Sequence, residues 1–203
     1  MNPWLETIGV ILVAVVGICL GWRFSRLKGL YWTTGYFFAL GLLAVLVLTI
    51  YNEKLTFMPP FSWITAGRVR FVILCLAATM GLTTPLSRLT RKFEKVTIAL
   101  LMVVVVTWFS VFPFLFPALI QDRLANLKTR INAEGICFQT TDYTCGPAAA
   151  VTALNRLGLP AQEGEIAVLS RTSPIAGTLP DCLYRALQNR YGQYGLKCQY
   201  RHF

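Results

Sequence analysis

Long apolar stretches without a charged residue alternate with short basic loops over the first 120 residues. These stretches are Thr7–Trp22, Gly29–Ile50, Phe71–Leu86 and Val96–Ile120. A helix needs about 20 apolar residues to cross a bilayer. The second and fourth stretches reach that length alone, and the first and third reach it with their flanks. The pattern predicts an α-helical membrane region of four transmembrane helices over residues 1–120.

Small residues recur four apart within two of these stretches. Gly17 and Gly21 form one pair, and Gly35 and Ala39 form another. Such pairs let neighbouring membrane helices approach closely. We therefore expect both pairs to serve helix packing.

The fourth stretch carries two prolines four residues apart, Pro113 and Pro117, which predict a bend near its end. No Asp, Glu, Lys, Arg or His lies inside any of the four stretches. Ionisable side chains within the bilayer mark most ion and proton pathways. Their absence from these four stretches argues against a pump or a secondary transporter.

The pattern changes after residue 120. Leu124, Leu127 and Ile131 lie at helical spacing in a charged segment that ends at Gly135, which predicts a helical linker over residues 121–135. The remaining residues, 136–203, predict a small mixed domain. Its expected elements are helices over Pro147–Leu157, Gln162–Ser170 and Asp181–Arg190 and a strand from Gly195 onward.

Composition and charge agree with a membrane protein. Apolar residues make up 55% of the chain, more than is usual for a soluble protein. The net charge is +10, and residues 1–120 hold ten Lys and Arg against three acids. These charges lie in loops between apolar runs, as expected for contact with a lipid bilayer rather than with nucleic acid. The basic loops divide almost evenly between the two sides, so both orientations stay open.

One cysteine of the C-terminal segment lies in a setting that suits nucleophilic chemistry. Cys145 precedes Gly146 and Pro147, at or just before the first turn of a predicted helix. The unpaired amides and the dipole at such a position would favour a thiolate. Gln139, six residues upstream, could donate its amide to an oxyanion formed on an attacked carbonyl. The alternative is that Cys145 is a small buried hydrophobe and Gln139 a surface amide.

The stretch "QTTDYTCGPAAA" resembles the opening motif of the bacteriocin-processing, double-glycine leader peptidases. These are papain-like cysteine peptidases that are often fused to peptide-exporting ABC transporters. The resemblance covers residues 136–203 and implies a small C-terminal α+β papain-like domain. It implies that Cys145 is the nucleophile, that Gln139 is the oxyanion donor and that the substrate is a peptide or leader segment cut after small residues. It also implies the bacterial inner membrane as the location.

The general base is where the sequence departs from this family. A cysteine peptidase needs a histidine oriented by an acid or amide. His202 is the single histidine of the chain, and "RHF" resembles the family's phrase, but it follows the first expected strand directly and no acid comes after it. His202 is thus either the base of a shortened domain or an incidental residue of an incomplete one. In the second case the chain is truncated, another chain supplies the missing strands, or the domain is inactive.

Other chemistry is not indicated. The four cysteines of the C-terminal segment lack metal-ligand spacing, and there is no phosphate-binding loop, so we expect no metal, no cofactor and no ATPase activity. Cys137 and Cys198 could form a disulfide outside the cytoplasm and would be thiols inside it.

The sequence leads to two hypotheses for the function: a membrane-anchored cysteine peptidase, or an inactive peptidase-like accessory protein that binds peptides or a transporter. A membrane protein with an unrelated tail is the third alternative.

Overall fold

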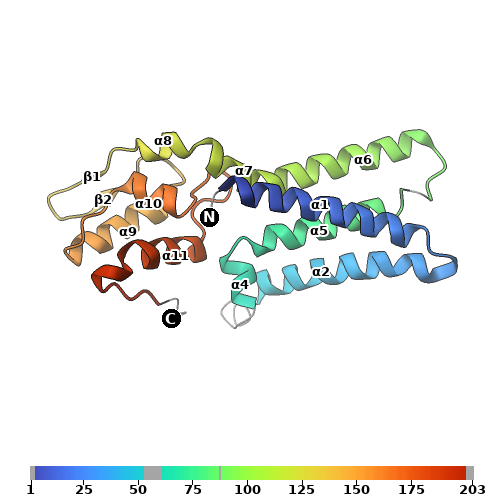
Figure 1. The fold of residues 1–203 in the computed structure, drawn as a ribbon, viewed down its shortest axis with the longest axis horizontal. Helices are drawn as coiled ribbons and strands as arrows, with labels where there is room; N and C mark the ends of the chain where they lie inside the picture. Colours follow the sequence, from blue (N-terminus) through green and yellow to red (C-terminus); the bar gives the residue numbers. More distant parts are fainter. Residues whose placement is uncertain (1–2, 53–60, 87, 200–203) are drawn as a thin grey trace. The chain divides into compact units, whose positions relative to one another are not determined.

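The fold is mainly helical, and its elements belong to two compact units, Met1–Phe114 and Leu115–Phe203. A computed structural model of the chain describes residues 3–52, 61–86 and 88–199 (Figure 1). The elements of the first unit and of the helix that leaves it are α1 (Pro3–Ser25), η1 (Gly29–Thr33), α2 (Thr34–Tyr51), α4 (Phe61–Ala66), α5 (Val69–Thr83), α6 (Lys92–Val106), the π-turn η2 (Thr107–Val111) and α7 (Phe112–Leu119).

Three of the four predicted spans are helices long and apolar enough to cross a membrane. They are Pro3–Ser25, Gly29–Tyr51 and Lys92–Leu119. The stretch predicted over Phe71–Leu86 forms α5, an apolar helix of 15 residues. At a rise of about 1.5 Å per residue, α5 is about 22 Å long, shorter than a hydrocarbon core of about 30 Å.

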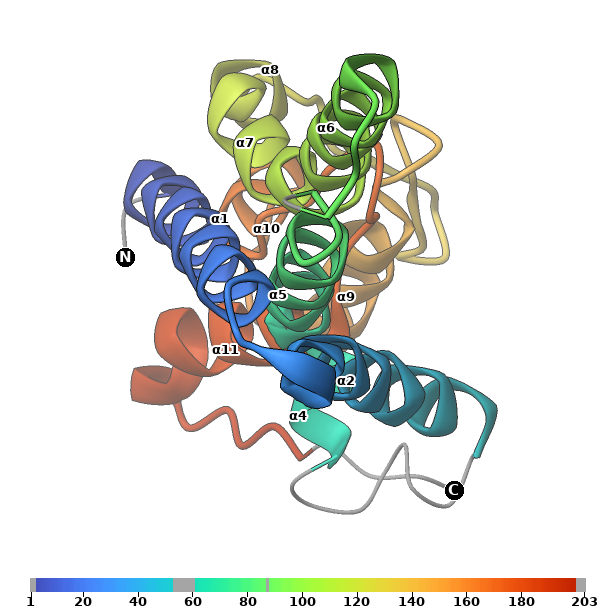
Figure 2. The same cartoon turned by 90° about the vertical axis from the view of Figure 1, so that its right-hand side faces the viewer.

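Helix α5 is the centre of the first unit. In the view of Figure 2 it lies among α1, α2 and α6. Its residues Cys75, Ala77, Thr79 and Met80 are almost completely buried, whereas the outer helices carry many exposed apolar side chains such as Phe37. An apolar surface this extensive is unfavourable in water and suits contact with lipid tails.

The small-residue pairs serve the packing that the sequence predicts. A Cβ atom at Gly21 would lie 2.7 Å from the Met80 carbonyl oxygen, and one at Gly17 would collide with Thr79. A Cβ atom at Gly35 would lie 2.9 Å from the Thr84 hydroxyl. Helix α1 therefore approaches α5, and α2 approaches the residue that follows α5, at distances that only glycine permits.

The helix that carries the two prolines contains a π-turn just before the first of them. Pro113 has no amide hydrogen, and its ring would clash with the carbonyl four residues earlier in a regular α-helix. The turn Thr107–Val111 widens the helix immediately before Pro113.

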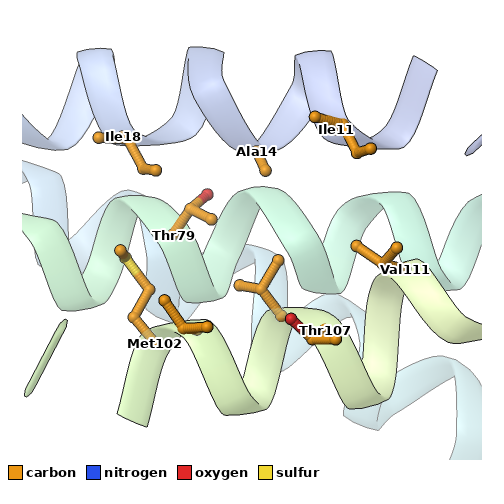
Figure 3. A pocket seen from close by; sticks show the side chains of 9 residues that line it. Ile11, Ala14, Ile18, Thr79, Met102, Thr107 and Val111 are labelled. Carbon is orange, nitrogen blue, oxygen red and sulfur yellow. The ribbon is translucent and has the colours of Figure 1, made fainter. Parts of the chain in front are cut away.

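A cavity of about 200 Å³ lies between α1, α5 and the helix formed by α6 and the π-turn (Figure 3). Ile11, Ala14 and Ile18 line it from α1, and Thr107 and Val111, the two ends of the π-turn, line the opposite side.

The second unit contains short helices and one small hairpin. Its elements are α8 (Gln121–Ala125), β1 (Arg130–Ile131), β2 (Cys137–Phe138), α9 (Cys145–Arg156), α10 (Glu163–Leu169), α11 (Pro180–Tyr191) and η3 (Gly192–Tyr194). The strands pair antiparallel, with Ile131 opposite Cys137. Val151, Leu154, Ile166 and Tyr191 form the centre of the core.

Two predictions for this unit are wrong. The helix expected over residues 121–135 ends at Ala125, and the chain continues into the hairpin. Asn132 explains the turn, since its side-chain oxygen accepts the amides of Glu134 and Ile136 and Gly135 adopts a φ of 79°. The strand expected from Gly195 onward is also absent from the described residues 195–199.

We predict that Gly21→Ala destabilises the first unit while Gly9→Ala does not. The added methyl group at Gly21 meets the α5 backbone, whereas a Cβ atom at Gly9, on the same helix, has nothing within 4 Å. Overpacking of this kind costs about 1–3 kcal/mol. Thermal unfolding of the full chain in detergent measures the difference, and equal melting temperatures for the two variants would contradict the close approach of α1 and α5.

Candidate functional site

Cys145 is the first residue of α9, and it is exposed. The preceding turn fixes its position, because the buried Thr144 hydroxyl donates to the Thr141 carbonyl oxygen at 3.0 Å and accepts the Thr141 amide at 3.1 Å. The Ala148 amide donates to the Thr144 carbonyl oxygen at 3.0 Å and closes the first turn of the helix. The helix begins two residues before the predicted Pro147, which places the thiol at its N-terminal end.

A loop from the other side of the unit lies against this first turn. A Cβ atom at Gly146 would be 2.9 Å from Cβ of Thr178, so the glycine allows close contact. The Thr178 hydroxyl shares a 2.7 Å hydrogen bond with Thr172, and Thr172 shares one of 3.2 Å with Ser170. These three hydroxyl groups hold the loop beside Cys145.

Gln139 follows β2 directly, and its side chain is exposed. The strand is tied to the helix that begins with Cys145, because the Cys137 amide donates to the Thr152 hydroxyl of α9 at 2.9 Å. The expected nucleophile and oxyanion donor therefore belong to two elements that are joined to each other. Within the described residues, neither side chain has a hydrogen-bond partner.

Glu163 is the residue near this site whose role the sequence did not indicate. It is fully buried at the first position of α10. Its carboxylate accepts the Thr140 amide at 2.8 Å and the Thr140 hydroxyl at 2.6 Å. No local signal in the sequence indicates this role, because Thr140 lies 23 residues away along the chain.

His202 lies outside the described residues. It is the single histidine of the chain, so the described part contains no imidazole. The structure thus positions the candidate nucleophile and the segment of the candidate oxyanion donor, whereas the candidate base stays a prediction.

All six cysteines are free thiols in the structure, and they differ in their surroundings. Burial raises the pKa of the Cys137 thiol, and the negative charge of Glu163 raises it further. Burial also raises the pKa of the Cys198 thiol. Both shifts disfavour the thiolate form of these two residues.

We predict that iodoacetamide alkylates Cys145 faster than Cys137, Cys182 or Cys198 at pH 7. Cys145 is exposed at a helix N-terminus, Cys137 is buried, and the other two are half-buried. Peptide mass spectrometry after timed labelling gives the four rates, each divided by the rate in the unfolded chain. If Cys145 reacts no faster than Cys182 or Cys198, it is not an activated nucleophile.

We also predict a pH-dependent contribution of Cys137 to stability. Its pKa is raised in the folded chain, so its contribution is complete below the ordinary thiol pKa of about 8.5 and declines as the pH rises above that value. The difference in free energy of unfolding between the natural chain and Cys137→Ala should be constant at pH 6–8 and smaller at alkaline pH. Denaturant titrations at several pH values test this, and a difference that grows with pH would contradict it.

Comparisons with known proteins give one relative and no family. A protein from Methanothermobacter thermautotrophicus, described as an uncharacterized protein, is 32% identical over 73 residues, which is 36% of this chain. The chain spans about half of that protein's length, 51%. No family model and no solved structure matches the chain.

Proposed function

We propose that this protein is a membrane-anchored cysteine peptidase of the double-glycine leader-processing type. The observation that carries the proposal is the exposed Cys145 at the start of α9, with Gln139 directly after a strand that is tied to the same helix. This arrangement is compatible with a thiol nucleophile on α9 and an amide donor on the adjoining segment. The papain-like fold of residues 136–203 is part of the proposal and rests on the resemblance of the motif.

In the proposed reaction, the base takes the proton of the Cys145 thiol, and the sulfur attacks the carbonyl carbon of a peptide bond. The C=O π pair moves to the oxygen, where the Gln139 side-chain amide and the Cys145 backbone amide stabilise the negative charge. The C–N bond then breaks, and the leaving amine takes a proton from the base. Water hydrolyses the resulting thioester and releases the second product, with the thiol restored. His202 is our candidate for the base.

The membrane region would anchor this domain through four spans. We propose that the third span is α5 with its flanking residues, because α5 alone is short. The break between α4 and α5 at Gly67 and Arg68 then lies at the edge of the span. The charge of Arg68 at this break is paired, since the Glu6 carboxylate lies 2.7 Å from it. A cytoplasmic membrane is the location that this proposal requires, with a peptide exporter of the ABC transporter class as a partner.

We predict that membranes containing this protein cleave a peptide with a double-glycine sequence, and that Cys145→Ala abolishes the cleavage. Gln139→Ala should lower kcat by about 100-fold, the usual effect of losing an oxyanion donor. His202→Ala should also abolish cleavage if His202 is the base. Cys182→Ala is the matched control, because Cys182 is a half-buried thiol on α11, and it should leave the rate unchanged. Mass spectrometry of the products measures each rate.

A second candidate is an inactive, peptide-binding accessory protein. The observation that favours it is that none of the described residues is a histidine, so no imidazole base is placed beside Cys145 in the described part of the chain. The same variants separate the two functions. If no cleavage occurs and Cys145→Ala still binds the peptide with unchanged affinity, the accessory function is supported and the peptidase is not.

A further inference from the structure

The buried carboxylate of Glu163 is committed to a single residue. Both of its oxygens accept hydrogen bonds from Thr140, one from the amide and one from the hydroxyl. A charge that served only the dipole of α10 could lie at the surface, where its desolvation costs nothing. Burying a carboxylate is expensive unless its hydrogen bonds compensate. We therefore infer that the main structural effect of the Glu163 carboxylate is to hold Thr140 in place.

Thr140 is adjacent to the candidate oxyanion donor. Its amide nitrogen belongs to the same planar peptide unit as the Gln139 carbonyl, so the bond to Glu163 fixes the plane that follows Gln139. On the preceding side, β2 is paired with β1 and the Cys137 amide is bound to Thr152. The backbone of Gln139 is thus restrained on both sides, while its side chain stays exposed.

We propose that Glu163 is a positioning residue that acts through Gln139, holding its backbone so that the side-chain amide can donate to an oxygen formed beside Cys145. This inference rests on the proposed function. The relevant step is the addition of the Cys145 sulfur to a carbonyl carbon, in which an S–C bond forms and the π pair of the C=O bond moves to oxygen. Glu163 touches neither reacting atom, and its effect is confined to this addition.

Two reagents for the same thiol separate this effect from a general loss of structure. A peptide aldehyde ending in glycinal adds to the sulfur and forms a hemithioacetal, whose oxygen takes its proton from water and occupies the position of an oxyanion. Iodoacetamide instead forms an S–C bond while the C–I bond breaks, and no oxyanion develops. The aldehyde affinity is measured as protection of Cys145 from iodoacetamide, in the full chain in detergent.

We predict that Glu163→Ala weakens aldehyde binding about tenfold and leaves the rate of alkylation without aldehyde unchanged within about twofold. Gln139→Ala should weaken aldehyde binding to the same extent. The double variant Glu163→Ala/Gln139→Ala should bind the aldehyde as well as Gln139→Ala alone does, because Glu163 acts only through Gln139. Glu165→Ala is the matched control. Glu165 lies on the same helix and pairs with Arg190 at 2.6 Å, so its removal should leave the aldehyde affinity unchanged.

Thr140→Val keeps the inference falsifiable if Glu163→Ala fails to fold. It preserves the shape of the side chain and removes the hydroxyl, which donates to Glu163 at 2.6 Å and lies 3.3 Å from the Lys128 carbonyl oxygen. It should weaken aldehyde binding about threefold. If Gln139→Ala weakens binding but Glu163→Ala and Thr140→Val do not, the proposed function stands and the role of Glu163 is wrong. Additive losses in the double variant, or a parallel loss of alkylation rate, would also overturn that role. If the aldehyde does not protect Cys145 in the natural chain, the proposed function fails and this inference fails with it.

Discussion

The hydrogen bonds of the Glu163 carboxylate hold together the part of the C-terminal unit from which the candidate site is built. Thr140 follows the second strand of the hairpin and donates to both carboxylate oxygens. Thr129 precedes the first strand, and its hydroxyl accepts the Glu163 amide at 2.8 Å. One residue of α10 therefore fastens both ends of the hairpin. Two strands of two residues each are too short to be stable alone, so this attachment and the bond from Cys137 to Thr152 determine where the hairpin lies.

The first unit is stabilised by a different principle. Apolar side chains gain little when they leave lipid for a helix interface, so close packing and small residues have to supply the attraction. The burial of α5 beneath Gly17, Gly21 and Gly35 follows this rule. In the C-terminal unit, by contrast, Leu154, Ile166 and Tyr191 form a compact apolar core of the kind that water favours. The first unit thus has surfaces compatible with lipid, and the second has an apolar core enclosed by its own helices.

The sequence predicts the helices whose ends are marked by residues that start or stop a helix, such as proline and glycine. The helix around Cys145 begins near Pro147 and ends before Gly158, and α10 and α11 agree with the predicted ranges to within about a residue or two, a normal margin. The hairpin was missed because Leu124, Leu127 and Ile131 mimic helical spacing, whereas the side chain of Asn132 stabilises a turn. The role of Glu163 could not be predicted, since its partner lies 23 residues away along the chain. The sequence singled out Cys145 and Gln139 as candidates, but it did not indicate the tertiary contact behind them.

The π-turn of the last apolar helix has a geometric consequence for the residues on either side of it. Successive residues of an α-helix are about 100° apart, so Val106 and Phe114, eight residues apart, would point about 80° away from each other. One additional residue within the turn leaves seven ordinary steps, and the difference falls to about 20°. Val106 and Phe114 accordingly bury their side chains in the same cluster with Cys75. The extra residue of the π-turn brings two side chains that are eight residues apart onto the same face of the helix. In a regular α-helix, residues seven apart lie on the same face in this way.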